Sequence, residues 1–222
     1  MAYIDFISTT HKSTTRDYLA RVNDPEYPKA KAASLAKQWD VDYWDGDRRV
    51  NYGGYRYDGR WARVAEAMVE HYGLGPGDKV LDVGCGKGFL VYDFMQVLPG
   101  LEAWGVDISR YALENAKEEV SDRLQLANAT CLPFEDNSFD LVVSITTLHN
   151  LHAYDLEKAL KEIERVGKKN KYICVESYRT EEEKANLLYW QVTCEAFNTP
   201  EEWDWWFKLT GYTGDYSYIY FE

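Results

Sequence analysis

The fold of this chain is decided by the stretch Val80-Leu81-Asp82-Val83-Gly84-Cys85-Gly86-Lys87-Gly88-Phe89-Leu90. An apolar run, a glycine-dense turn and an amphipathic run predict a strand, a tight loop and a helix, in that order. Glycines let the backbone approach a ligand closely and adopt positive φ at little steric cost. The first turn of the helix directs its free N–H groups at the same place, so we expect the turn to attract an anion or a polar cofactor.

The spacing of the glycines separates two kinds of cofactor. A dinucleotide-binding turn reads G-x-G-x-x-G, which would require a glycine at position 89 after Gly84 and Gly86. That position holds Phe89, and the third glycine is Gly88. The pattern is therefore Asp82-x-Gly84-x-Gly86-x-Gly88. A glycine-rich structural turn that binds no ligand is the alternative.

A second acid follows at the end of the next predicted strand. Residues 102–109 read Glu-Ala-Trp-Gly-Val-Asp-Ile-Ser, and Asp107 stands about twenty residues beyond the glycine turn. A carboxylate at this place can accept hydrogen bonds from both hydroxyls of a ribose. The alternative role, capping the next helix, is better served by Ser109. The turn and Asp107 together predict a cofactor that contains a nucleoside.

The composition bounds the size of the fold and the choice of partners. The 222 residues, of which 45% are hydrophobic, suffice for one α/β domain with an elaboration. A formal net charge of −12 argues against binding to nucleic acid or to an anionic membrane. There is neither an apolar stretch of membrane-spanning length nor a signal-peptide segment. We therefore expect a cytoplasmic protein whose four widely spaced cysteines are reduced.

Residues 43–61 have the most unusual composition in the chain, because Tyr and Trp alternate with glycine and charge. Such loops often form ligand walls and lids, since aromatic rings supply contact area and a polar tip. We expect a helical and aromatic cap over residues 1–61 and a core over residues 62–222; a packed surface loop is the alternative. Arg56 or Arg60 could pair with a carboxylate of the cofactor. The candidate substrate contacts in this segment are Tyr52, Tyr55, Arg56, Tyr57 and Trp61.

The alternation of strands and helices continues in the second half of the chain. The predicted strand at residues 139–145 opens onto Thr146-Thr147-Leu148-His149-Asn150, where the carboxyl ends of parallel strands form a ligand-binding crevice. His149 is therefore the candidate that removes a proton from a substrate hydroxyl or amine; orienting a loop is its alternative role. His152 lies three residues further on, but no cluster of acids or cysteines accompanies the pair, so we expect no metal site.

The C-terminal part supplies further candidate contacts. Residues 172–177 read as the fifth strand, so Glu176 and Tyr178 would emerge at the same sheet edge as the histidine. Residues 214–221 read as the last strand. Residues 180–194 read as a helix with an inner face of Leu187, Leu188, Tyr189 and Trp190. Glu176, Tyr178 and Arg179 are second-rank substrate contacts, and Trp190 and, from the loop after the fourth strand, His152 are further candidates.

Residues 82–177 resemble the core of the class I S-adenosylmethionine-dependent methyltransferases. The resemblance rests on the glycine spacing, on Asp107, on Asn128 in place of the family's adenine-contacting acid, and on the Phe139-Asp140 start of strand four. It implies S-adenosylmethionine as cofactor, with S-adenosylhomocysteine as product. It also implies a Rossmann-like α/β fold, a mostly parallel sheet of six or seven strands with helices on both faces. The cofactor-binding positions it implies are Asp82, Gly84, Cys85, Gly86, Gly88, Asp107, Ile108, Asn128, Ala129, Thr130, Ser144 and Thr146.

The end of the chain departs from this family. The usual core ends in a hairpin of two strands, whereas only one convincing strand follows Tyr212. The seventh strand, and any homodimer contact at this sheet edge, are left open. The whole chain also resembles an uncharacterised bacterial subgroup that has a Tyr-rich segment before the core and His149-Asn150-Leu151 after strand four. Surface-polysaccharide and small-metabolite pathways are the context associated with that subgroup.

The resemblance implies methyl transfer to an oxygen or nitrogen of a small molecule, such as a sugar or a related metabolite. Methylation of a protein or peptide gripped by the aromatic segment is the second enzymatic hypothesis. A third hypothesis is a non-catalytic scaffold that binds the cofactor and a partner protein.

Overall fold

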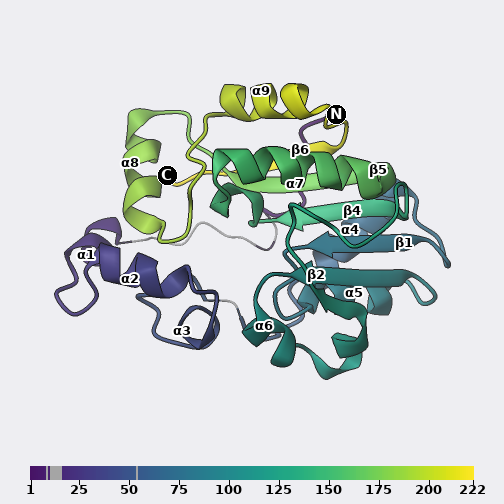
Figure 1. The fold of residues 1–222 in the computed structure, drawn as a ribbon, viewed down its shortest axis with the longest axis horizontal. Coiled ribbons are helices and arrows are strands. Elements are labelled where there is room, and N and C mark those ends of the chain that lie inside the picture. Colours follow the sequence, from purple (N-terminus) through teal and green to yellow (C-terminus); the bar gives the residue numbers. More distant parts are fainter. Residues whose placement is uncertain (9, 11–16, 54) are drawn as a thin grey trace.

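The computed structural model describes residues 1–8, 10, 17–53 and 55–222, and a six-stranded sheet forms its centre (Figure 1). The strands lie in the order β3-β2-β1-β4-β5-β6, and all five neighbouring pairs are parallel. This arrangement confirms the predicted Rossmann-like α/β fold. The strands are β1 (Lys79–Val83), β2 (Glu102–Asp107), β3 (Leu124–Leu126), β4 (Phe139–Ile145), β5 (Gly167–Glu176) and β6 (Asp215–Ile219).

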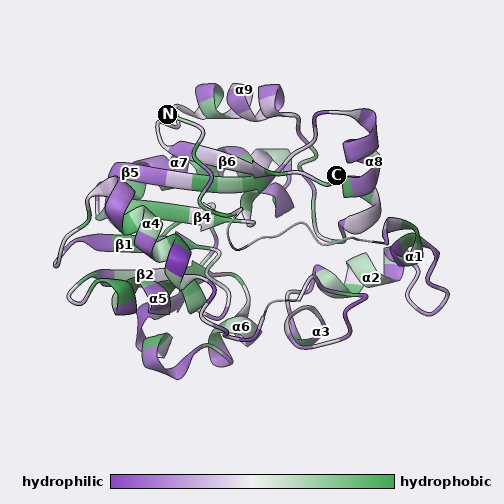
Figure 2. Ribbon diagram, turned by 180° about the vertical axis from the view of Figure 1, so that it is seen from behind, coloured by the Kyte–Doolittle hydropathy of each residue, from purple (hydrophilic) through white to green (hydrophobic). Residues whose placement is uncertain are grey.

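Helices cover both faces of the sheet because successive strand residues point to opposite sides. In β1, Val80 packs into the core cluster that contains residues of α4 and α5, whereas Leu81 and Val83 pack with α7 and α9. Figure 2 shows the hydrophobic colour of β4 between these two layers. The covering helices are α4 (Ala62–Tyr72), α5 (Phe89–Val97), α7 (Ala153–Val166) and α9 (Pro200–Thr210).

The order of the strands opens a crevice at one edge of the sheet. The chain runs from β1 to its neighbour β2 and later returns to β4 on the other side of β1, and open α/β sheets bind ligands at such a reversal. The segments that follow the strands at this edge are therefore placed to line a site. They include the 3₁₀ helix η2 (Leu148–Asn150) after β4 and the end of α8 (Glu181–Trp190) after β5. The two helices after β2, α6 (Arg110–Glu114) and the 3₁₀ helix η1 (Glu118–Arg123), supply no lining residue.

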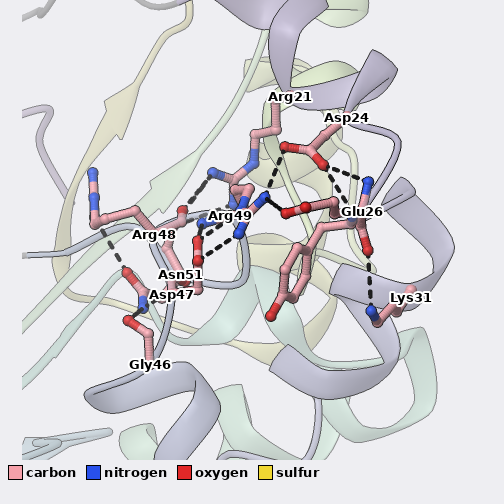
Figure 3. Close-up of polar contacts among 10 residues, drawn as sticks. Arg21, Asp24, Glu26, Lys31, Gly46, Asp47, Arg48, Arg49 and Asn51 are labelled. Carbon is pink, nitrogen blue, oxygen red and sulfur yellow. Dashed lines mark hydrogen bonds and ion pairs between the residues drawn. The ribbon is translucent and has the colours of Figure 1, made fainter.

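Three short helices form a lobe that lies on the same side of the sheet as α8 (Figure 1). They are α1 (Tyr18–Asn23), which packs beside α8, and α2 (Lys29–Ala36) and α3 (Val41–Trp44), which pack around a small apolar cluster that includes Tyr43 and Val50. Figure 3 shows the polar contacts that tie this lobe together. Arg49 pairs with Asp24, Glu26 and Asp47, and the Arg21 guanidinium donates to the carbonyls of Arg48 and Asn51.

The first residues pack with the sheet and not with this lobe. Tyr3 forms a parallel bridge with Tyr216 of β6, and the Ile4 N–H donates to the Tyr216 carbonyl at 2.9 Å. Phe6 and Ile7 are buried in the same core cluster as α4 and α5. The stretch that opens the chain therefore extends the sheet beyond β6.

Several local features differ from the sequence-based expectation. The helix predicted over residues 180–194 ends at Trp190, and residues 191–199 are irregular. Leu188 and Tyr189 are 41% and 39% exposed, because α8 buries the face that carries Leu187 and, four residues earlier, Glu183. The fifth strand begins at residue 167 and not at 172.

One strand, β6, follows Tyr212, and the second strand of the family's hairpin is absent from the described residues. The sheet is therefore parallel throughout, because β6 is reached by the long crossover through α8 and α9. Within the part of the chain that is described, no helix has the length and apolar character needed to cross a membrane.

Candidate active site

A cavity of about 820 Å³ opens at the carboxyl ends of the central strands, within the size range of small-molecule and cofactor sites. Its floor is the glycine turn between β1 and α5. One wall is residues 39–53, which we call the aromatic strap. Other parts of the wall come from η2 and from residues 190–193. The aromatic side chains that line the cavity are Trp39, Tyr43, Trp44, Tyr52, Tyr55, Trp61, Phe89, Trp190 and Phe221.

The glycine turn is shaped by close approaches that leave no room for side chains. Gly84 and Gly86 have φ values of +86° and +55°. A Cβ on Gly84 would lie 2.1 Å from Thr147 Oγ1, and one on Gly86 would lie 2.7 Å from the Trp44 ring. Gly88 caps α5 and faces η1 and β3, so it lies outside the cavity lining. Two of the three glycines therefore form the floor of the site.

Asp107 ends β2 and holds the glycine turn in place. Its Oδ2 accepts the Gly86 N–H at 2.8 Å, and its Oδ1 accepts the Ser109 N–H at 2.7 Å. Burial raises the pKa of the Asp107 carboxyl, and these two donors oppose the rise. Ser109 caps α6 by accepting from the Ala112 N–H, as the sequence predicts. Asp107 lines the cavity, so its oxygens can also accept hydrogen bonds from a ligand.

Asp82 is a second buried acid at the floor of the cavity. Burial and the charge of Asp107 raise the pKa of its carboxyl to about 8. None of the hydrogen bonds between described residues reaches this carboxyl group. A cationic ligand group beside it would stabilise the ionised form and lower its pKa.

His149 and Glu176 form a buried pair at the ends of η2 and β5. The backbone N–H of Glu176 donates to His149 Nδ1 at 3.4 Å, and His149 Nε2 lies 3.5 Å from Glu176 Oε2. Burial lowers the pKa of His149 to about 3. The imidazole is therefore neutral at physiological pH, and both of its nitrogens face the same neighbour.

Tyr52 connects one end of the aromatic strap to this pair. Its hydroxyl donates to Gln191 Oε1 at 2.5 Å and accepts the N–H of Val192 at 2.7 Å. Gln191 Nε2 in turn donates to Glu176 Oε1. A continuous row of hydrogen bonds thus runs from the strap to the carboxylate that faces His149.

The strap is bound to the glycine turn at its other end. Lys87 Nζ lies 2.7 Å from Asp45 Oδ2, and the Tyr111 hydroxyl donates to the same oxygen at 2.9 Å. The Trp44 Nε1–H donates to Ser109 Oγ at 2.8 Å. The strap therefore spans the cavity, with contacts to the glycine turn and α6 on one side and to residues 191–193 on the other.

The structure brings most of the predicted site residues to the cavity. Asn128 and Ala129 line it after β3, beside the glycine turn and Asp107. Arg60 also lines it, although its guanidinium pairs with Asp58. The predicted residues in the lining are Asp82, Gly84, Cys85, Gly86, Asp107, Ile108, Asn128, Ala129, Thr146, His149, Tyr52, Tyr55, Trp61, Glu176 and Trp190.

The remaining predicted residues lie elsewhere, each for a visible reason. Ser144 is buried beneath the site and donates to the Val83 carbonyl. The Tyr57 hydroxyl donates to Asp93 of α5, and Tyr178 is buried in the core cluster of α4 and α5. Three further residues lie outside the cavity lining. Arg56 and His152 are exposed, the latter beside Glu195, and Thr130 is half-buried and donates its N–H to Asn128.

Several lining residues were not singled out by the sequence. Trp44 lies within the predicted aromatic segment, but its place over Gly86 depends on the fold of α3. Gln191 and Thr193 follow α8 in a segment predicted to be helical. A polar pair in an irregular segment carries no local signal, and only its contact with Tyr52, 139 residues away from Gln191, identifies it. Among the described residues, no group of three His, Cys, Asp or Glu side chains could hold a metal ion.

Comparisons with known proteins agree with this geometry. A family model described as "Methyltransferase domain" matches residues 74–211. A demethylmenaquinone methyltransferase of Symbiobacterium thermophilum is 38% identical over 128 residues, which cover 54% of this chain and 50% of that protein. A sterol 24-C-methyltransferase of Gibberella zeae is 36% identical over 52% of this chain and 31% of its own length. The match thus spans half or less of each of these two relatives.

Solved structures show the same fold. The YcgJ protein of Bacillus subtilis has a TM-score of 0.55 with 24% identity over 66% of each chain. The [4+2]-cyclase SpnF has a TM-score of 0.58 with 18% identity over 81% of this chain and 72% of its own. The family model covers more than half of the chain, from the strand before the glycine turn to the end of α9. The chain therefore belongs to the methyltransferase domain family and has the Rossmann-like fold of the class I S-adenosylmethionine-dependent methyltransferases.

Proposed function

We propose that this protein transfers the methyl group of S-adenosylmethionine to an oxygen or nitrogen of a small molecule held beneath the aromatic strap. The observation that carries the proposal is the enclosure of the cavity by a strap that is bound at both ends, to Lys87 and to Gln191. A site of about 820 Å³ can accommodate a cofactor and a small acceptor together. A sugar or related metabolite fits this description, and an enclosed wall disfavours a long peptide.

The residues at the floor of the cavity fit the cofactor. Gly84 and Gly86 let Thr147 and the Trp44 ring approach the turn closely, so the turn presents bare backbone to the cavity there. Asp107 presents carboxylate oxygens for ribose hydroxyls, and Asn128 lines the cavity where an adenine amine could donate to its side-chain oxygen. Asp82 supplies an acid to which no described residue donates a hydrogen bond, and its buried charged form would be stabilised by a cationic group nearby.

The protein contributes binding, alignment and proton transfer to the reaction. When bound, S-adenosylmethionine supplies a methyl group that its sulfonium already activates. The chain must hold the acceptor in line with that methyl group and exclude water. The aromatic side chains of the strap and Trp190 provide the contact area for the acceptor.

Isothermal titration with S-adenosylmethionine, in parallel with NAD, tests the choice of cofactor. We expect a response to the methyl donor and none to NAD. Tight binding of NAD alone would overturn the proposal. Labelled methyl donor incubated with a fractionated metabolite extract, followed by mass spectrometry, should then identify the acceptor; binding without any labelled product would favour the scaffold hypothesis.

Asp107→Asn should weaken the binding of S-adenosylhomocysteine by about 10- to 100-fold, because a hydrogen bond to a charged group contributes about 1.5–3 kcal/mol. The substitution keeps the shape of the side chain but replaces one acceptor by an amide. Asp140→Asn is the matched control, since Asp140 pairs with Lys168 at the opposite end of the sheet. Unchanged affinity in Asp107→Asn would refute the ribose role.

A further inference from the structure

We infer that Glu176 accepts the proton of the acceptor, and that His149, Gln191 and Tyr52 hold its carboxylate in place. The inference rests on the methyl transfer proposed above, and it moves the role of base away from His149. It is drawn from the hydrogen-bond geometry of these four neighbouring side chains. Glu176 and His149 both line the cavity.

The tautomer of His149 decides which of the two groups can take a proton. Because the Glu176 N–H donates to Nδ1 at 3.4 Å, Nδ1 is the acceptor nitrogen, and the proton of the neutral ring belongs on Nε2. Nε2 lies 3.5 Å from Glu176 Oε2, so this edge of the imidazole stands beside the carboxylate. This tautomer leaves no imidazole lone pair for an acceptor molecule. His149 is therefore placed to orient Glu176.

The carboxylate is also held from the side of the aromatic strap. Gln191 donates to Glu176 Oε1 and receives the Tyr52 hydroxyl proton at 2.5 Å. The Trp203 Nε1–H donates to the Glu176 carbonyl at 3.0 Å, which fixes the end of β5. Groups from η2, the strap, the segment after α8 and α9 thus converge on one residue. Such preorganisation is what a general base requires, because a small displacement costs catalytic efficiency.

The proposed step balances in atoms and charge. A lone pair of the acceptor oxygen or nitrogen forms the new bond to the methyl carbon, and the electrons of the broken sulfur–carbon bond stay on sulfur. The proton of the acceptor moves to the Glu176 carboxylate. One positive and one negative charge are thereby lost from the cavity. A site shielded from water favours this outcome, because charges are costly there.

Four of the titratable groups near Glu176 are neutral over the working pH range. They are His149, Tyr52, Cys174 and Cys194. Burial lowers the pKa of His149 to about 3, raises that of Cys174 to about 12, and raises those of Tyr52 and Cys194. All four are therefore neutral near neutral pH. Titration of these four groups would therefore not account for a change in the pH profile of a Glu176 variant.

Nitrogen-15 NMR of the whole protein with labelled histidine tests the tautomer without any acceptor. We expect the Nε2–H tautomer of His149 at neutral pH and no titration above about pH 5. An Nδ1–H tautomer, or titration of His149 near its ordinary pKa, would return the role of base to His149. Because this measurement uses the unaltered protein, it stays decisive if a variant fails to fold.

Glu176→Gln and Glu183→Gln form a matched kinetic pair. Both replace a buried carboxylate by an amide, but Glu183 pairs with Arg179 outside the cavity. With labelled methyl donor and the fractionated extract as probe, Glu176→Gln should lower kcat by about 100-fold or more and leave the Kd for S-adenosylhomocysteine nearly unchanged. Glu183→Gln should change neither.

The outcomes of this experiment separate the two proposals. Glu176→Gln that turns over like the unaltered protein would overturn the inference about the base and leave the methyl transfer standing. An unaltered protein that binds no S-adenosylmethionine would overturn the proposed function instead. Glu176→Asp keeps a carboxylate, so we expect it to retain more activity than Glu176→Gln and to keep the pH dependence that Glu176→Gln loses.

The positioning role of the strap has its own test. Tyr52→Phe removes the hydroxyl that orients Gln191, and Tyr57→Phe removes a hydroxyl that contacts Asp93 outside the cavity. Tyr52→Phe should lower kcat by about 10-fold, the equivalent of a hydrogen bond of about 1.4 kcal/mol, without changing the Kd for S-adenosylhomocysteine. Equal kcat values for the two variants would show that the strap does not act through Gln191.

Discussion

Asp82 and Asp107 are buried acids at the floor of one cavity, but hydrogen bonds stabilise the ionised carboxylate of Asp107 and not that of Asp82 among the described residues. Two backbone N–H groups donate to Asp107 and oppose the effect of its burial on the pKa. Asp82 has no such donor among the described residues, and burial beside Asp107 raises its pKa to about 8. Near neutral pH Asp82 therefore holds a proton, which a cationic ligand group beside it would displace.

This assignment predicts how stability depends on pH. Between pH 3.8, the ordinary pKa of an aspartate, and about pH 8, Asp82 is protonated in the folded protein but ionised in the unfolded chain. The free energy of unfolding therefore falls as pH rises through this window. Asp82→Asn should remove this fall, with a gain on the order of a few kcal/mol at pH 8 relative to the native protein. Urea unfolding at several pH values measures it. Parallel pH profiles for the two proteins would contradict the raised pKa.

At the scale of elements, the aromatic strap is stabilised mainly by its ends. Asp45 meets Lys87 and Tyr111, and Tyr52 meets Gln191. The strap contributes a small apolar cluster of its own and does not belong to the two large clusters of the sheet. We therefore expect it to open without unfolding the core.

Asp45→Ala should make the strap easier to open, because Lys87 loses its carboxylate partner. Trypsin provides the measurement, since Arg48 and Arg49 lie within the strap. We expect cleavage there to become several-fold faster, with little change in Tm, and S-adenosylhomocysteine to slow it. Asp155→Ala, which breaks an exposed pair with Lys158 on α7, is the control. Equal cleavage rates in the two variants would show that Asp45 does not hold the strap.

The elements also show which parts of the site a sequence can reveal. The glycine turn, Asp107 and the position of His149 follow from local patterns, because each stands directly after a strand with a clear apolar run. The two contacts of His149 with Glu176 do not follow from such patterns, because only the fold creates them. Gln191 was not predicted for the same reason, because its contact with Tyr52 exists only in the folded chain. The exposure of Leu188 was not predicted either, since it depends on which face of α8 packs against the core.

At the scale of the whole molecule, residues 1–7 contribute to the core although a lobe of three helices separates them from it in sequence. The Phe6 ring contacts the Tyr172 ring of β5 at a centroid distance of 5.1 Å, and Tyr3 adds to the edge of β6. The parallel sheet was predictable from the alternation of patterns along the chain. This contact between the opening residues and the sheet was not, because no local signal marks it.

Phe6→Ala should lower the free energy of unfolding by roughly 3–5 kcal/mol, as expected for a large side chain removed from a packed core. Tyr3→Ala is the comparison, since the Tyr3 side chain is 50% exposed and should contribute much less. Urea denaturation of both variants provides the values. A loss below about 1 kcal/mol for Phe6→Ala would show that the opening residues are peripheral to the core.

The bond between Tyr52 and Gln191 also has a consequence for biosynthesis. The two residues are 139 positions apart. At a ribosomal rate of about 5–20 residues per second, Gln191 is synthesised on the order of ten seconds after Tyr52, so the strap lacks this hydrogen-bond partner during that time. During that interval its tyrosines and tryptophans are exposed on a nascent chain and are available to chaperones. The binding site is therefore among the last features of this protein to form, long after the glycine turn has been translated.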